Sequence, residues 1–415
     1  MNAKYDHGIQ WHEISSILNL RYNYFPKSEN LGSSYHNSLG SFVNANTFYL
    51  RSIDNFIFKN HFYFFMDSKL QVENLDQFKS NKKINFSTSI NSSGIGYQND
   101  WALIQVGKGK ENWGSGNNIS LGLGSESENY DYFLLASNYG KIRVSFLYGF
   151  LERTESDYNR FLTARGLEWT NKKSLVISLS EVVIYSGFNR SFDIAYLNPI
   201  SSHLELELNN RLNKSGTGSA NAIWQFHLDF LFRDISRISI NYLFDEFVLD
   251  PKLELNKEHG KAYSVRKSFK IFSTKTQKLN LFFSRVMVGT PTFRHSSGTS
   301  NFVNKNKPMG WIYGSDGTEN SFGLNFFKED KFILNNTFSI IQYGEENLLK
   351  NPYFSYKDYL KGPFPSGEIK KTKVLKIFFS WNYNKNLRLQ IRGSIQFKPN
   401  EENISSLYFG IISSK

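Results

Sequence analysis

The segment AIWQFHLDFLFR, residues Ala222–Arg233, decides the fold. Its even-numbered positions are all apolar, and the positions between them include Gln225, His227 and Asp229. An alternation with a period of two residues predicts a β-strand with one apolar face and one polar face. Roughly ten residues suit a strand that crosses a membrane at a tilt, whereas strands of globular proteins average about 5–6 residues.

The same alternation recurs along the chain, and it places basic residues on the polar faces. Leu387–Lys398 and Ile142–Phe150 are two such segments. If the apolar faces meet lipid, the basic side chains line a lumen, where a positive field would attract an anionic polymer. The alternative is a chain that is simply rich in Lys, Asn, Ile and Phe. The residues predicted to bind polysaccharide from the lumen are Arg143, Arg388, Arg392, Lys376 and Lys398.

From Arg160 onward, the connections between these segments are short and long in turn. The short ones are Asn171–Lys173, Arg233–Ser236, Thr274–Lys278, Lys328–Lys331 and Asn384–Asn386. The long ones are Gly187–Asn221, Asp250–Lys261, Thr290–Asn320, Gly344–Lys371 and Pro399–Ile404. Short periplasmic turns and long extracellular loops are typical of outer-membrane barrels.

The predicted fold is therefore an all-β, transmembrane antiparallel β-barrel of about 18 strands. We expect the first strand at Ser41–Ile53 and the last at Ser405–Ser413. Residues 41–415 would form the barrel. Residues 1–40 would form an N-terminal periplasmic cap or plug, as a short helix or an extended segment, or alternatively a first strand of the barrel.

Composition limits the class of protein. The 415 residues carry 49 Lys+Arg against 37 Asp+Glu, a formal charge of +12, and no cysteine, which excludes disulfides and thiolate metal sites. No stretch approaches the ~18 consecutive apolar residues of a membrane helix. Nucleic acid is not an expected partner, because no DNA- or RNA-binding module is recognisable. The start, MNAKYDHGIQWHE, shows no signal peptide as written, although the predicted location is the bacterial outer membrane.

Three segments carry a family resemblance. They read VGKGKENWGSGNNISLGLGS (Val106–Ser125), GLEWTNKKSLVISLSEVVIY (Gly166–Tyr185) and AYLNPISSHLELELNN (Ala195–Asn210). Their order resembles the capsule assembly Wzi family of outer-membrane proteins. The resemblance implies an 18-stranded barrel that holds capsular or other surface polysaccharide and acts as a lectin, not an enzyme. The matching residues are Trp113, Gly114, Gly116, Ser180, Glu181, Tyr196, Leu197, Asn198 and Pro199.

Glu181 interrupts the apolar face that it shares with Leu175, Ile177 and Leu179. An unpaired buried carboxylate is costly, so this residue needs a partner or water. One interpretation is a lumen or plug-contacting Glu that pairs with Arg or Lys. The other is a bulge or strand end that returns the side chain to water.

Motifs for chemistry are otherwise weak. Gly107-Lys108-Gly109 is not followed by Gly-Lys-Ser/Thr, so a phosphate-binding loop is not expected. Neither a zinc-protease motif nor an ordered Ser, His and Asp set is found. We therefore predict no catalytic residue, no metal and no cofactor.

Two of the long connections, Gly310–Gly317 and Asn351–Phe364, contain clusters of aromatic residues. Flat rings can stack on sugars and ammonium groups can pair with uronate carboxylates, although the rings could instead pack the loops together. The loop residues predicted to bind polysaccharide are Trp311, Tyr313, Tyr353, Tyr356, Tyr359, Lys357 and Lys361.

The sequence as a whole favours a monomeric barrel that binds anionic surface polysaccharide and contacts outer-membrane lipid. A channel for polysaccharide export, an anion-preferring porin and a soluble all-β glycan-binding module are the alternatives.

Overall fold

The computed structural model describes most of the chain. The described residues are 34–43, 47–58, 61–73, 86–114, 120–124, 127–208, 219–233, 235–245, 260–329, 331–355, 363–384, 386–399 and 402–414. Within these ranges, no helix has the length and apolar character needed to cross a membrane. The first 33 residues lie outside the described part, so the N-terminal cap or plug stays a prediction.

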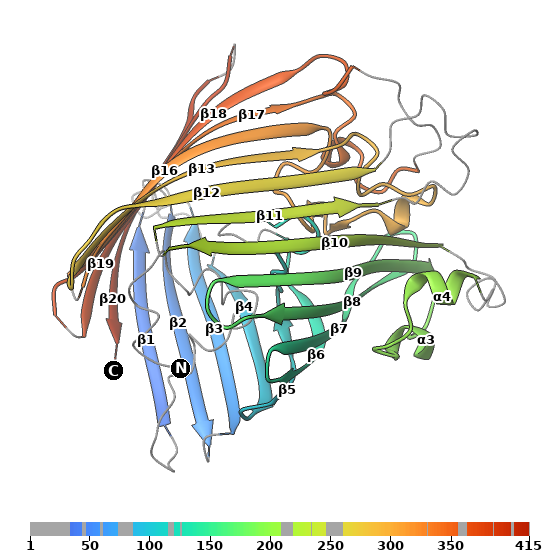
Figure 1. The fold of residues 1–415 in the computed structure, drawn as a ribbon, viewed down its shortest axis with the longest axis horizontal. Coiled ribbons are helices and arrows are strands. Elements are labelled where there is room, and N and C mark those ends of the chain that lie inside the picture. The colour runs from blue at the N-terminus through green and yellow to red at the C-terminus, as the bar shows by residue number, and fades with distance from the viewer. Residues whose placement is uncertain are drawn as a thin grey trace.

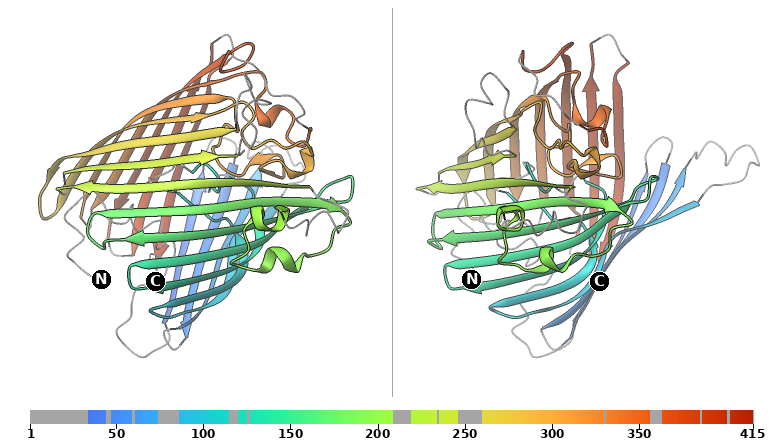
Figure 2. Two further views of the ribbon diagram at one scale, coloured as in Figure 1. Left: turned by 45° about the vertical axis from the view of Figure 1, so that its right-hand side comes forward. Right: turned by 90° about the vertical axis from the view of Figure 1, so that its right-hand side faces the viewer.

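A closed antiparallel barrel of 18 strands forms the molecule (Figures 1 and 2). Each strand pairs with its neighbours in the chain, and the last strand pairs with the first. The strands are β1 (Ser34–Val43), β2 (Thr47–Phe58), β3 (Phe62–Glu73), β4 (Phe86–Gln98), β5 (Ala102–Gly109), β6 (Tyr130–Tyr139), β7 (Ile142–Arg153), β8 (Tyr158–Thr170), β9 (Leu175–Phe188), β10 (Ser219–Phe232), β11 (Ser236–Phe244), β12 (Lys261–Ser273), β13 (Gln277–Val288), β16 (Gly317–Lys328), β17 (Phe332–Tyr343), β18 (Lys370–Asn382), β19 (Leu387–Phe397) and β20 (Ile404–Ser414). The predicted fold class is confirmed.

The first strand differs from the prediction. The segment expected to be one strand, Ser41–Ile53, contains the end of β1 and the start of β2. The sequence between them, Asn44-Ala45-Asn46, contains two asparagines, and asparagine favours turns. The alternation on either side obscured this signal. The expected domain boundary at residue 41 therefore falls inside β1.

The alternation of short and long connections is confirmed. Short connections join β4 to β5, β6 to β7, β10 to β11, β12 to β13 and β16 to β17 at one end of the barrel. The long ones at the other end include residues 110–129, 189–218, 289–316 and 344–369. Because periplasmic turns are short in outer-membrane barrels, the long connections mark the extracellular end.

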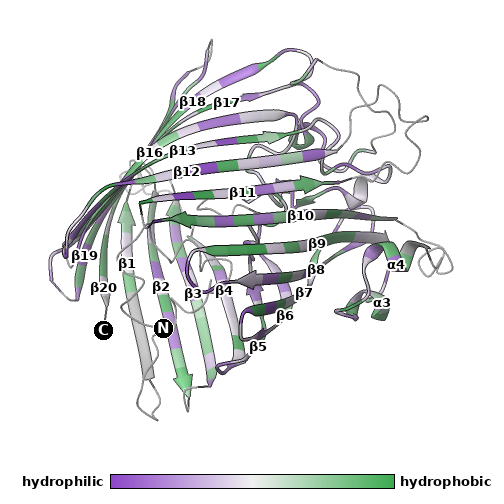
Figure 3. Ribbon diagram, viewed as in Figure 1, coloured by the Kyte–Doolittle hydropathy of each residue, from purple (hydrophilic) through white to green (hydrophobic). Residues whose placement is uncertain are grey.

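Polar and apolar residues alternate along many strands (Figure 3), and the burial of individual side chains assigns them to the two faces of the wall. On β9, Leu179 points outward and is 58% exposed, whereas its neighbours Ser178 and Ser180 are buried on the lumen side. On β10, the polar residues His227 and Asp229 are likewise buried inside. Outward side chains are thus mostly apolar, whereas the inward ones include these polar residues.

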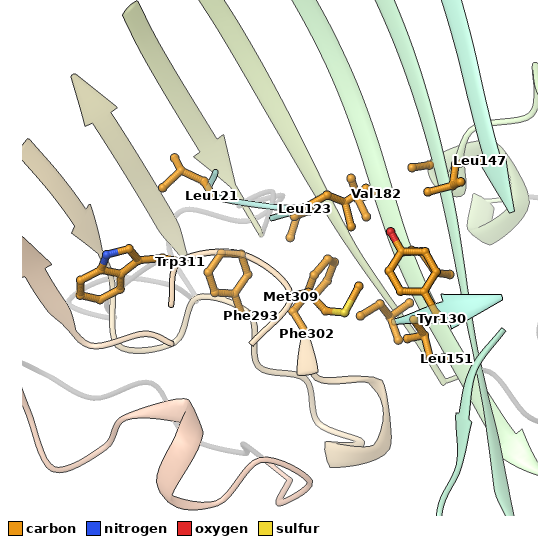
Figure 4. Close-up of a cluster of buried hydrophobic side chains, with 14 of the residues drawn as sticks. Leu121, Leu123, Tyr130, Leu147, Leu151, Val182, Phe293, Phe302, Met309 and Trp311 are labelled. Carbon is orange, nitrogen blue, oxygen red and sulfur yellow. The ribbon is translucent and has the colours of Figure 1, made fainter. Parts of the chain in front are cut away.

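The lumen is not empty, because long connections fold into it. Leu121 and Leu123 from one connection and Phe293 and Met309 from another join a buried cluster with inward side chains of the wall, such as Val182 (Figure 4). We call these inward-folded connections, residues 110–129 and 289–316, the plug. Its short elements are η4 (Gly298–Ser300), β14 (Val303–Asn304) and β15 (Lys307–Pro308), and η5 (Leu348–Lys350) lies in the 344–369 connection beside it.

Two short helices lie on the outside of the barrel, at the extracellular end of β9 and β10 (Figures 1 and 2). They are α3 (Ile194–Leu197) and α4 (His203–Leu208). Tyr196 and Leu206 of these helices are buried against outward side chains of the wall, including Tyr148, Val183 and Tyr185. This second cluster is separate from the cluster inside the lumen.

Candidate functional site

A buried arginine fastens the plug to the wall. The Arg160 side chain on β8 is fully buried and donates from Nε to the Thr299 carbonyl at 2.6 Å and from Nη1 to the Val303 carbonyl at 2.8 Å. It also pairs with Glu152 on β7. Because a buried guanidinium is stable only with its donors satisfied, these contacts make the plug a fixed part of the barrel.

The aromatic residues of the loops pack the loops together. Trp311 is only 5% exposed, and its Nε1–H donates to Glu319 Oε2 at 2.9 Å. Tyr313 lies edge-on to Trp311, with ring centroids 5.4 Å apart. The Tyr353 hydroxyl donates to Glu152 Oε1 at 2.7 Å, and burial raises the Tyr353 pKa to about 12. A role for these rings in glycan binding stays a prediction, and four of the residues predicted with them lie outside the described part of the chain: Tyr356, Lys357, Tyr359 and Lys361.

The five basic residues predicted for the lumen do not form one patch. Arg143 is on β7, near its periplasmic end, and Arg388 is near the periplasmic end of β19. Arg392 and Lys376 point inward from the middle of β19 and β18, opposite outward residues such as Ile395 and Ile377. Lys398 lies just beyond β19 at the extracellular end. Alternation gave the correct face for the four residues on strands, but they lie at different heights and on two walls.

Arg392 belongs to a cluster of rings and cations where the last strands meet the first. We call it the seam cluster: Phe42, Tyr49, Lys69, Arg392 and Tyr408. The Phe42 and Tyr49 rings stack at 4.7 Å, and the Tyr408 ring lies 6.2 Å from Tyr49. Lys69 Nζ lies 4.3 Å from the Tyr49 ring centre, and Arg392 Cζ lies 5.6 Å from that of Phe42.

The seam cluster lies in the extracellular half of the lumen, because Phe42 and Tyr49 flank the connection 44–46. Tyr49, Lys69, Arg392 and Tyr408 are each half-buried, so parts of their side chains reach open space. Arg392 donates from Nη2 to Gln390 Oε1 at 3.1 Å, and its buried Nε has no hydrogen-bond acceptor among the described residues. The guanidinium as a whole is only half-buried, and such a group can donate to a carboxylate ligand.

Sequence analysis missed every member of the seam cluster except Arg392. Its residues come from both ends of the chain, and only the closure of the barrel brings them together. Gly410 makes room for the cluster, because a Cβ at this position would lie 2.3 Å from the Phe42 ring. A glycine inside an alternating strand was the one available signal of close packing.

Glu181 is paired, as one interpretation required, but on the outer face and not in the lumen. It accepts from Arg165 Nη1 at 2.9 Å, from Trp224 Nε1 at 3.0 Å and from the His203 backbone N–H at 2.9 Å. Arg165 Nε also donates to the Asn198 carbonyl at 3.2 Å. We call this group of Arg165, Glu181, Tyr196, His203 and Trp224 the outer clamp, since it holds α3 and α4 against the wall.

Ring stacking completes the outer clamp. The Tyr196 ring lies 4.2 Å from Tyr185 at an interplanar angle of 10°. Burial raises the pKa of Tyr196 and lowers the pKa of His203 to about 4, so His203 is neutral at physiological pH. Asn198 and Pro199 are exposed beside the clamp. The motif residues Glu181, Tyr196 and Asn198 thus meet in one structure on the outside of the barrel.

The glycine-rich motif lies inside the lumen. Trp113 is half-buried, and it forms an isolated backbone bridge with Leu123 of the plug. Its ring lies so close to Gly166 that a Cβ there would approach it to 3.1 Å. Gly114, with a φ of 155°, follows, whereas Gly116 lies outside the described residues. In the described part of the chain, no three His, Asp or Glu side chains are arranged to hold a metal ion.

Comparisons with known proteins support the fold. No family model and no curated protein matches the sequence. Among solved structures, the chain is similar to Wzi, an outer membrane protein involved in group 1 capsule assembly in Escherichia coli and described as a carbohydrate-binding β-barrel. The TM-score is 0.64 at 11% identity, over 92% of this chain and 84% of that one. OprD of Pseudomonas aeruginosa gives a TM-score of 0.49 at 9% identity, over 94% and 96% of the two chains. The protein is a bacterial outer-membrane β-barrel.

Proposed function

We propose that this barrel binds and anchors anionic surface polysaccharide, and that it does so without catalysis. The observation that carries the proposal is the seam cluster in the extracellular half of the lumen. Stacked rings offer apolar faces to sugars, and Lys69 and Arg392 offer positive charge within 4.3 Å and 5.6 Å of those rings. The half-buried Arg392 guanidinium suits a uronate carboxylate.

The plug favours binding over transport. Side chains of the plug form a continuous buried cluster with the wall, and Arg160 fixes it through several hydrogen bonds. A porin needs a water-filled path, whereas a lectin needs a rigid surface on which the rings and cations keep their spacing. We therefore prefer polysaccharide binding to an export channel or an anion-preferring porin.

Kinship with the Wzi family is part of this proposal. The resemblance rests on the glycine-rich motif around Trp113 and on motif residues at the outer clamp, such as Glu181 and Tyr196. The similar fold of the carbohydrate-binding Wzi barrel agrees with it. On this basis, the protein would act in capsule assembly, by retaining polymer at the cell surface.

Retention of polysaccharide on cells tests the function. A strain that lacks the gene is complemented with the wild type, with Lys69→Glu/Arg392→Glu, or with Lys173→Glu, a matched charge reversal in an exposed periplasmic turn. We expect the double variant to release most of the acidic polysaccharide into the medium and the control to retain it. Full retention by the double variant, at equal amounts of folded barrel, would refute the assignment of the site.

A further inference from the structure

A row of polar residues crosses the lumen wall in its periplasmic half. Its four residues lie opposite one another on neighbouring strands. They are Arg143 on β7, Glu168 on β8, Ser178 on β9 and His227 on β10. All four side chains point inward. His227 is held in place by Asn241 Oδ1 at 2.7 Å and Ser180 Oγ at 3.0 Å. The row is therefore a fixed part of the wall.

The side chains of two members of this row have no hydrogen-bond partner among the described residues. Glu168 is 4% exposed, and neither of its carboxylate oxygens meets a donor among the described residues. The Ser178 hydroxyl beside it is also unpaired and buried. A buried carboxylate without donors is costly, so a structure that keeps one beside a cavity leaves acceptors for a ligand that brings its own donors.

Both residues line a cavity of about 80 Å³. A water molecule needs roughly 10–15 Å³ of such space, so the cavity has room for about five to eight waters, which is enough for one edge of a sugar ring with its vicinal hydroxyls. Trp113 of the plug forms one side of the cavity, and Asn99 in the short turn 99–101 places it near the periplasmic edge. The seam cluster is on other strands and in the opposite half of the lumen.

The chemistry of the lining selects among ligands. Phosphate, sulfate and a uronate carboxylate are themselves hydrogen-bond acceptors, so they do not supply the hydroxyl donors that the Glu168 oxygens lack. Arg143 on the adjacent strand disfavours a simple metal cation, because two positive charges would face each other. A neutral sugar satisfies the site: two vicinal hydroxyls can donate to the two oxygens of one carboxylate, and an apolar sugar face can lie on an indole ring.

We propose that this cavity is a second carbohydrate site, which binds one neutral glycosyl residue from the periplasmic side. Glu168 accepts hydrogen bonds from two sugar hydroxyls, the Ser178 hydroxyl makes a third contact, and Trp113 supports the ring. The site does not depend on the binding of an acidic polymer at the seam cluster, and each can exist without the other.

Titration of the purified barrel in detergent with neutral methyl glycosides tests the proposal. Methyl α-glycosides of glucose, galactose and mannose are the probes, and saturation-transfer NMR of the glycoside reports binding. At least one should bind saturably. Because Glu168→Ala leaves two sugar hydroxyls without their acceptor, it should weaken binding about tenfold or more, and Trp113→Ala should weaken it about fivefold.

Glu402→Gln, at an exposed residue between β19 and β20, is the matched control and should bind like the wild type. Heat-modifiable gel mobility verifies that each variant is folded, and Glu168→Gln, a change of one atom, replaces Glu168→Ala if that variant fails to fold. If no glycoside binds, or if binding survives Glu168→Ala and Trp113→Ala unchanged, the cavity holds only water and the proposal is wrong.

Discussion

Removing the carboxylate of Glu181 should release α3 and α4 from the barrel wall. In Glu181→Ala, three donors lose their acceptor: Arg165 Nη1, the Trp224 indole N–H and the His203 backbone N–H. The side chains of Arg165 and Glu181 are only 11% and 8% exposed, so water replaces little of what is lost. The barrel itself should stay intact, since its strands are held by their own ladders.

The magnitude follows from this burial. Breaking a buried ion pair by removing one partner costs about 3–5 kcal/mol. Taking the lower value, the undocked population of the outer helices should rise about 100-fold, because each 1.4 kcal/mol is a factor of ten. Glu181→Gln keeps an acceptor oxygen and should have a smaller effect, whereas Arg165→Met/Glu181→Ala removes both charges and should recover part of the loss.

Chymotrypsin cleavage after Tyr196 measures the undocked population, because this residue is fully buried in the docked helices. When opening is fast relative to cleavage, the cleavage rate follows the population of the open form. We expect the 196–197 bond to be cut about 100-fold faster in Glu181→Ala than in the wild type, with unchanged heat-modifiable mobility of the barrel. A rate within a factor of about two of the wild type would refute the reasoning.

Three further predictions concern acidity, conductance and the seam. The pKa of His203 is about 4 in the docked helices and about 6.5 when the side chain is free, so the undocked state binds more protons between these pH values. Lowering the pH to 5 should therefore weaken docking by about 2 kcal/mol. Cleavage after Tyr196 should become faster, and His203→Gln should reduce this pH effect. In planar bilayers the wild type should be nearly silent, and replacing plug residues 289–316 with a short turn should open steady conductance; steady wild-type conductance would contradict the plugged lumen. Gly410→Val should displace the Phe42 ring and weaken binding of acidic polysaccharide, without loss of the barrel by gel mobility; unchanged binding would show that the ring is dispensable.

The strands and their faces could be predicted from the sequence, because the side chains of a β-strand alternate strictly between two faces. The apolar row of Ala222–Arg233 and the inward position of Arg392 follow from that rule alone. The alternating lengths of the connections also predicted which end of the barrel is periplasmic and which is extracellular. Each of these features depends only on neighbouring residues in the chain.

The sites could not be predicted in the same way. The height of a basic residue in the lumen depends on the stagger between strands, so Arg143 on β7 and Arg392 on β19 both face the lumen but lie at different heights. The apolar face of β9 suggested a partner for Glu181, but the pattern cannot show that a long connection turns back along the outside. Phe42, Tyr49 and Tyr408 meet only because the barrel closes.

The central claim is that the seam cluster binds anionic surface polysaccharide. The most direct test is a calorimetric titration of the purified barrel with acidic polysaccharide extracted from the surface of the producing bacterium. We predict saturable binding that weakens as the salt concentration rises from about 50 to 300 mM. Lys69→Glu/Arg392→Glu should abolish this binding, and Lys173→Glu should preserve it. Equal binding by the wild type and the double variant, or no binding by the folded wild type, would contradict the claim.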